Sequence, residues 1–197
     1  WLRGDEYDGI MNYSITKACL DYLVYDVFDA QAMADRLSHI LMRNTDQANN
    51  MMLNLLDSHD TERFLTLAKK NGKDERSLLC SLAIMFFLPG MPCIYYGTEI
   101  GMEGGYDPDC RRTFDWNRKN WNMRVYATVI NLIRLRKCIK GDVTYSAENG
   151  ILLIGRGDLI LAVNNGTEKR RTKILHKEYE IGPFEFIIIN IKEGEVL

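Results

Sequence analysis

The stretch from residue 53 to residue 66 constrains the fold of this chain more than any other. An apolar run from Met51 to Leu56, interrupted only by Asn54, predicts a buried strand. The run ends abruptly in the polar sequence DSHDTER, residues 57–63. A strand that ends in titratable groups is typical of the functional edge of a parallel α/β sheet, where rigid strands hold side chains over a crevice.

The same residues allow a structural interpretation. They could form a polar turn that leads into a helix, with Ser58 or Asp60 as the N-cap and Glu62 or Arg63 in the first turn. Residue chemistry alone supports both interpretations equally.

The first 140 residues alternate short apolar runs with helical patterns. Strands are expected at 7–13, 51–56 and 93–96, with a polar loop at 44–50. Helices are expected after four candidate N-caps, Ser14, Asp29, Asp74 and Asn120. This order gives about three β/α units, and spacing alone would also allow a flavodoxin-like half sheet.

The pattern changes near Gly141. Short β-rich runs follow at 151–154, 159–163, 172–175 and 184–191. Hairpin signals are found at 149–150, 157–158 and 165–166. We therefore predict one unit over residues 1–140 and a small antiparallel β domain over residues 141–197.

Composition excludes several classes of protein. A chain of 197 residues with 46% hydrophobic content can bury a substantial core. The net charge of −2 argues against a nucleic-acid partner, and the densest basic run, residues 169–171, is expected in a solvated hairpin. No stretch is long and apolar enough to span a bilayer, so no membrane contact is expected.

The cysteines and the first residue bear on the cellular compartment of the protein and on whether the chain is part of a longer one. Five cysteines lie far apart without a metal-ligand spacing, and an odd count favours a reducing cytoplasm. No signal peptide opens the chain, but its first residue is Trp1. We expect a piece of a longer protein, which leaves open whether an export signal precedes it.

Three segments together resemble the α-amylase family of glycoside hydrolases, in that family's order. SHDTER at 58–63 resembles its last conserved catalytic segment. FLPGMPCIYYGTEIGM at 87–102, followed by GGYDPDCR at 104–111, is similar to the family's eighth strand and the loop after it, especially in the cyclomaltodextrinase and neopullulanase branch. WLRGDEYDGIMNY at 1–13 resembles the segment after the family's acid/base glutamate.

The resemblance implies a fold and an activity. Residues 1–140 would form the last three β/α units of a TIM-type (β/α)8 barrel, followed by a small antiparallel β-sandwich. The longer protein would be a retaining hydrolase of α-1,4 or α-1,6 glucosidic bonds in maltodextrins, cyclodextrins or pullulan. A transglycosylase and a non-catalytic sugar-binding or structural member of the family are the alternatives.

The resemblance also assigns site residues. Asp60 matches the family's third catalytic carboxylate, which stabilises the transition state, and His59 would donate a hydrogen bond to the same sugar. Asp107 and Arg111 would contact the next sugar, unless they form a loop-closing salt bridge. One departure is Thr98, where many relatives carry aspartate, and this leaves the fine substrate preference open.

Other candidates have a weaker basis. Tyr95, Tyr96 and Trp116 could stack on sugars, although aromatics beside a buried strand more often belong to the core. The acidic residues of the loop after 97 fit no calcium-binding spacing, so neither a metal nor a cofactor is expected.

The family's nucleophile and general acid lie before Trp1, so we expect the 197-residue chain alone to be inactive. Its partners should be α-glucan oligosaccharides. Because a barrel cut before its sixth strand leaves an unpaired edge, we also expect self-association, exchange of elements or pairing with the missing N-terminal half.

Overall fold

Parallel strands lie at the centre of the first part of the chain. The computed structural model describes residues 2, 3 and 5–197. In it β1 (Leu53–Leu55) pairs in parallel with β2 (Met91–Cys93), and Met11 forms an isolated parallel bridge to Leu53. The strand expected over 7–13 is thus reduced to one bridge, and the strand expected over 93–96 overlaps β2 only at Cys93.

Six α-helices surround these strands in the described part of the chain: α1 (Tyr13–Leu23), α2 (Ala30–Met42), α3 (Asp46–Met51), α4 (Phe64–Lys70), α5 (Glu75–Phe87) and α6 (Met123–Arg136). The polar loop expected at 44–50 is wrong, because the Thr45 side chain accepts a hydrogen bond from Ala48 N and caps α3. These helices and the parallel strands together confirm the mixed α/β structure predicted for the first 140 residues.

Two of the four predicted N-caps are confirmed. Asp29 accepts a hydrogen bond from Ala32 N at the start of α2, and Asp74 caps α5. The other two are wrong: α1 begins after Asn12, without a side-chain cap, and α6 begins after Asn122. The shift at α6 arises because residues 118–120 form a separate 3-10 turn.

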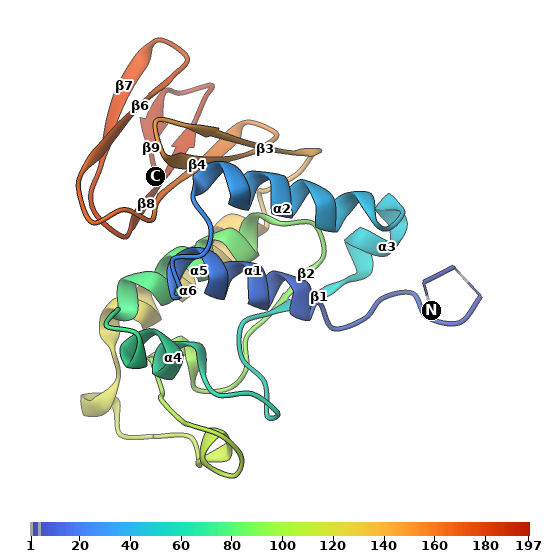
Figure 1. Cartoon of the computed structure of the whole chain (residues 1–197), viewed down its shortest axis with the longest axis vertical. Coiled ribbons are helices and arrows are strands. Elements are labelled where there is room, and N and C mark those ends of the chain that lie inside the picture. The colour runs from blue at the N-terminus through green and yellow to red at the C-terminus, as the bar shows by residue number, and fades with distance from the viewer. Residues whose placement is uncertain (1, 4) are drawn as a thin grey trace.

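An antiparallel sheet follows, as predicted. Its strands are β3 (Val143–Glu148), β4 (Ile151–Arg156), β5 (Leu159–Asn164), β8 (Glu185–Asn190) and β9 (Glu195–Val196), in the order β3-β4-β5-β8-β9. A separate hairpin is formed by β6 (Arg170–Ile174) and β7 (Lys177–Ile181). In Figure 1 these strands lie at one end of the molecule, with α4 and the loop after β2 at the other.

The hairpin signals at 149–150 and 157–158 are confirmed, because they connect β3 to β4 and β4 to β5. The signal at 165–166 is wrong, since β5 pairs with β8 and not with β6. Asn164 explains the departure: its side-chain amide donates to the carbonyl oxygens of Glu168, Ile181 and Gly182. This contact turns the chain out of the sheet and into the hairpin.

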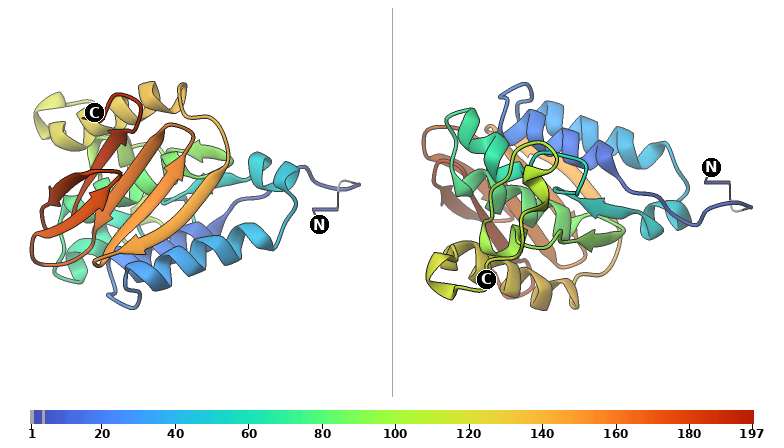
Figure 2. Two further views of the ribbon diagram at one scale, coloured as in Figure 1. Left: turned by 90° about the horizontal axis from the view of Figure 1, so that it is seen from above. Right: turned by 90° about the horizontal axis from the view of Figure 1, so that it is seen from below.

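Side chains of the five-stranded sheet alternate between two apolar layers, as the period of a strand requires. One face packs on the helices, and Figure 2 (left) looks onto this sheet with the helices behind it. The other face packs on the β6–β7 hairpin through Ile174 and Ile181. The basic run at 169–171 lies on this hairpin, where Lys169 and Arg171 pair with Glu180, as expected for a solvated hairpin.

The core is continuous across residue 141. Residues of α2 and α5 and of strands β4, β5 and β8 belong to one cluster of buried side chains. Arg156 on β4 donates to the carbonyl oxygens of Phe87 and Leu88 at the end of α5, over 3.0 and 2.7 Å. Burial and the neighbouring Arg156 lower the pKa of Arg136, which binds the same helix end, to about 10. The division into two domains at residue 141 stays a prediction.

Candidate functional site

The turn after β1 is anchored by a buried carboxylate. Asp57 accepts a hydrogen bond of 2.6 Å from Thr98 Oγ1 and another from Phe64 N, the first residue of α4. Burial raises the pKa of Asp57, and these two hydrogen bonds act in the opposite direction. Arg63 occupies the N-cap position of α4 without a capping side-chain bond, and Asp57 instead accepts from the first helical N–H, so the interpretation that Ser58 or Asp60 caps the helix is wrong.

His59 and Asp60 lie exposed on this turn. His59 Nε2 lies 3.3 Å from Asp60 Oδ1, and their side chains are 54% and 61% exposed. The backbone beneath them is fixed, because Ser58 Oγ accepts a hydrogen bond from Asp60 N and another from the Tyr13 hydroxyl. Cys110 Sγ donates to the His59 carbonyl oxygen over 3.2 Å. The turn therefore presents an imidazole and a carboxylate to solvent from a constrained backbone.

The loop after β2 brings Asp107 and Arg111 to the same place. Arg111 Nη2 lies 3.4 Å from Asp60 Oδ1, and Arg111 Nε lies 2.7 Å from Asp107 Oδ1. All four residues predicted from the sequence thus form one chain of contacts: His59, Asp60, Arg111 and Asp107. The loop-closing salt bridge is also present, since Arg111 and Asp107 pair directly.

Arg63 holds this loop against the turn, a role that sequence reasoning missed. Its side chain is fully buried, its Nη1 donates to the Tyr96 carbonyl oxygen over 2.9 Å, and its backbone N donates to the Gly104 carbonyl oxygen over 2.9 Å. The guanidinium lies over the rings of Tyr95 and Tyr96, at 4.7 and 5.1 Å from their centroids. The sequence signal was an arginine in the polar segment, interpreted only as a residue of the first helical turn.

The close approach of the loop also depends on Gly104. A Cβ atom at this position would lie 2.6 Å from the carbonyl oxygen of Asp109. Gly104 N donates to Thr66 Oγ1 over 2.8 Å, and the Tyr96 hydroxyl donates to the Arg112 carbonyl oxygen over 2.8 Å. Backbone contacts therefore fix the loop on both sides of Arg111.

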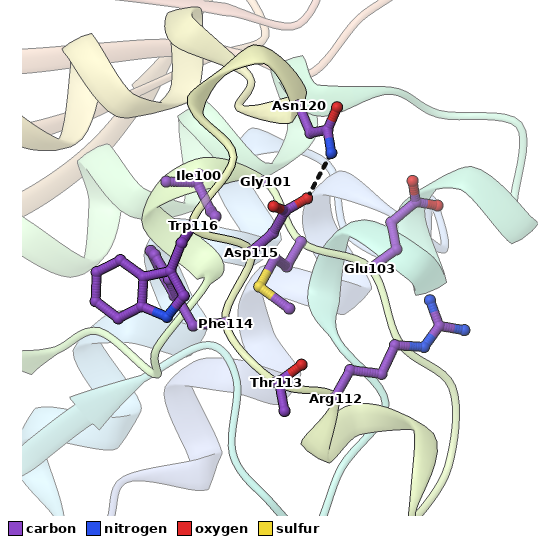
Figure 3. A pocket seen from close by; sticks show the side chains of 10 residues that line it. Ile100, Gly101, Glu103, Arg112, Thr113, Phe114, Asp115, Trp116 and Asn120 are labelled. Carbon is purple, nitrogen blue, oxygen red and sulfur yellow. Dashed lines mark hydrogen bonds between the residues drawn. The ribbon is translucent and has the colours of Figure 1, made fainter.

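The loop after β2, which carries Asp107 and Arg111, also forms a pocket of about 760 Å³ (Figure 3). Its lining includes Glu103, Arg112, Asp115 and Trp116, and none of the four residues predicted from the sequence. Within the described residues, no group of three histidine, cysteine, aspartate or glutamate side chains is arranged to hold a metal ion. No described helix is long and apolar enough to cross a membrane.

The cluster around Asp60 can act on an uncharged polyol. An exposed carboxylate accepts hydrogen bonds from hydroxyl groups, and it stabilises positive charge that develops nearby. The Arg111 guanidinium and the Asp107 carboxylate can each form paired hydrogen bonds with vicinal hydroxyls.

Two curated proteins are similar over most of this chain. The intracellular maltogenic amylase of Bacillus subtilis is 45% identical over 137 residues, which are 70% of this chain and 23% of the relative. The cyclomaltodextrinase of Geobacillus thermopakistaniensis is 39% identical over 172 residues, 85% of this chain and 28% of the relative. The chain thus spans about a quarter of the length of these relatives.

A solved structure matches the fold. The cyclic α-maltosyl-(1→6)-maltose hydrolase from Arthrobacter globiformis, in complex with maltose, superposes with a TM-score of 0.89 at 30% identity. The match covers 96% of this chain and 46% of that protein. The pattern of the family described as "Alpha amylase, catalytic domain" matches residues 1–141. With the parallel strands and the sequence identities, this match shows that the chain belongs to the α-amylase family of glycoside hydrolases.

Proposed function

We propose that this chain is part of a retaining α-glucan hydrolase that cleaves α-1,4 or α-1,6 glucosidic bonds in maltodextrins, cyclodextrins or pullulan. The observation that carries the proposal is the contact of Arg111 with Asp60, 3.4 Å apart, at the carboxyl end of β1. In parallel barrels this is the end at which catalytic side chains gather. The relatives named cyclomaltodextrinase and maltogenic amylase support the substrate class.

The strand order supports a barrel origin. Met11, β1 and β2 are parallel neighbours, each followed by helical structure, as in three consecutive β/α units of a TIM-type barrel. We propose that these are its last three units, and that the sheets after residue 141 form the β-sandwich that follows the barrel.

Asp60 is the proposed transition-state-stabilising carboxylate. It would hydrogen-bond sugar hydroxyls and oppose the positive charge of an oxocarbenium-like transition state, an effect worth roughly 3–4 kcal/mol for one preorganised group. His59 would bind the same sugar. By the resemblance to the family, Asp107 and Arg111 would bind the next sugar, and the contact of Arg111 with Asp60 supports this.

The nucleophile and the general acid would lie in the part of the relatives that this chain does not span. A covalent glycosyl intermediate needs one carboxylate at the anomeric carbon and a second acid near the leaving oxygen. We therefore expect no hydrolysis by residues 1–197 alone. A cytoplasmic location agrees with five free cysteines and with a relative named intracellular.

Fusion to the missing part of the barrel tests this proposal. Residues 1–197 would replace the matching segment of the Geobacillus cyclomaltodextrinase, and the fusion would be assayed on cyclodextrin, maltotriose and pullulan. We expect hydrolysis with retained anomeric configuration. NMR of the freshly released product measures that configuration. Transfer of glucosyl units as the main reaction would favour the transglycosylase alternative. Correctly folded fusion protein that binds maltotriose without cleaving it would favour the non-catalytic one.

A further inference from the structure

Trp116 is unusually accessible for so large an aromatic side chain. It is 82% exposed and lies on the wall of the 760 Å³ pocket shown in Figure 3. Its ring is nevertheless supported, because Phe114 packs edge-on against it with 4.7 Å between centroids. Phe114 packs in turn on Trp121, at 5.9 Å. An indole supported from one side by two half-buried aromatic rings is a preordered stacking surface, since less side-chain freedom is lost on binding.

Charged groups lie across the pocket from this indole. Figure 3 shows Glu103 and Arg112 on the opposite side from Trp116, with Asp115 between them. The Asp115 carboxylate accepts hydrogen bonds of 2.8 Å from Asn120 Nδ2 and from Asn117 N, and these hold its pKa below the ordinary range. It therefore stays an ionised acceptor at neutral pH.

The pocket also offers donors. In the described part of the chain, neither the Trp116 indole N–H nor the Thr113 hydroxyl has a hydrogen-bond partner. Two carboxylates and one guanidinium line the pocket, which disfavours an anionic ligand. Glu103 also pairs with Lys69, and Arg112 with Asp109, each over 2.6 Å, so a ligand would share these groups with their partners. An uncharged ligand with an apolar face and many hydroxyl groups matches both the stacking surface and the mixture of donors and acceptors.

We propose that this pocket binds an α-glucan oligosaccharide, with one sugar ring stacked on Trp116 and its hydroxyl groups hydrogen-bonded to Glu103, Asp115 and Arg112. The choice of an α-glucan rests on the proposed function. Arg112, which lines the pocket, directly follows Arg111, which contacts Asp60, so the pocket and the Asp60 cluster share one loop. The volume of about 760 Å³ lies within the usual range for small-ligand sites, roughly 300–1,000 Å³.

Calorimetric titration of the 197-residue chain with maltoheptaose tests the proposal. Four proteins are compared: the unchanged chain, Trp116→Ala, Trp116→Phe and the control Asp158→Asn, which changes an exposed aspartate in the turn between β4 and β5. Because Trp116 is exposed, its replacement should leave the helix and strand content, and thus the far-ultraviolet circular dichroism, close to that of the unchanged chain. We expect Trp116→Ala to weaken binding by about tenfold, as for the loss of an aromatic anchor, and Trp116→Phe to restore most of it.

The variants separate this proposal from the proposed function. Binding that falls in Trp116→Ala and persists in Asp158→Asn supports the pocket. An equal loss of binding in Trp116→Ala and Asp158→Asn overturns it. Equal binding by Trp116→Ala and the unchanged chain, or no heat of binding by a folded unchanged chain, overturns the pocket. The fusion assay described above then decides the proposed function independently.

Discussion

Arg111 Nη2 lies 3.4 Å from Asp60 Oδ1, although 51 positions separate the two residues in the sequence. The contact joins the turn after β1 to the loop after β2. Both side chains remain accessible, at 45% and 61% exposed, so solvent screening limits the contribution of this pair to stability. The pair lies at the carboxyl end of β1, where a bound sugar could contact both groups at once, so a role in binding is expected of it more than a role in stability.

Arg111→Ala should weaken the use of long maltooligosaccharides more than the hydrolysis of a small aryl glucoside. The reason is that only the longer substrate would reach the Asp107–Arg111 pair. Specificity constants for both substrates, measured on the fusion with the cyclomaltodextrinase, check this. Arg111→Lys is the matched control, because it keeps the charge and loses the paired geometry. An equal loss on both substrates would indicate a structural salt bridge.

Asp57 should make stability depend on pH. Burial raises its pKa in the folded chain above the ordinary value of 3.8, so the folded state binds this proton more tightly than the unfolded state. The contribution of Asp57 to the free energy of unfolding is complete below pH 3.8, its ordinary pKa, and is lost as the pH rises through the raised pKa of the folded chain. Asp57→Asn should therefore flatten the decline in the free energy of unfolding as the pH rises above about 4. Urea unfolding at a series of pH values measures this.

Thr98→Val is the partner experiment for Asp57. The substitution removes the hydroxyl that donates a hydrogen bond of 2.6 Å to Asp57 Oδ2. It should lower the free energy of unfolding by about 1–3 kcal/mol at neutral pH. In the double variant with Asp57→Asn the two effects should be non-additive, because the residues are in direct contact. Strict additivity, or parallel pH curves for Asp57→Asn and the unchanged chain, would contradict this account.

The chain should self-associate through an apolar surface beside the parallel strands. Ile10, Met11, Met51 and Met91 are each between 41% and 45% exposed and line one shallow hollow. Met51→Lys with Met91→Lys should shift the sedimentation profile toward monomer, by placing charges on this surface. Met42→Lys is the control, since Met42 is 85% exposed and lies outside the hollow. A concentration-independent monomer of the unchanged chain would contradict the prediction.

The sequence predicted element types better than element ends. The Asp29 and Asp74 caps were visible because each precedes a strong helical pattern with a side chain that can bond to the first turn. The short helix α3 was missed because its polar residues carry no apolar period. The Asn165-Gly166 signal was overridden by Asn164, whose long-range contacts depend on the folded hairpin.

The candidate site shows the same limit. Motif resemblance identified His59, Asp60, Asp107 and Arg111, and the structure brings them together. Sequence reasoning could not identify the contact of Asp57 with Thr98 or that of Arg63 with Tyr96, because the two partners of each contact lie more than 30 positions apart. Their roles depend on packing between β1 and β2, which no local pattern records.

Asp60→Asn in the fusion with the cyclomaltodextrinase is the most direct measurement of the central claim. The turnover number on maltotriose should fall by about 10²–10³-fold, as for the loss of one preorganised electrostatic group. The melting temperature should not change, because the side chain is exposed. Asp158→Asn is the matched control: this aspartate is 51% exposed, pairs with Lys192 and lies in the turn between β4 and β5. If Asp60→Asn retains the turnover number of the control, Asp60 is not the transition-state-stabilising carboxylate and the account is wrong.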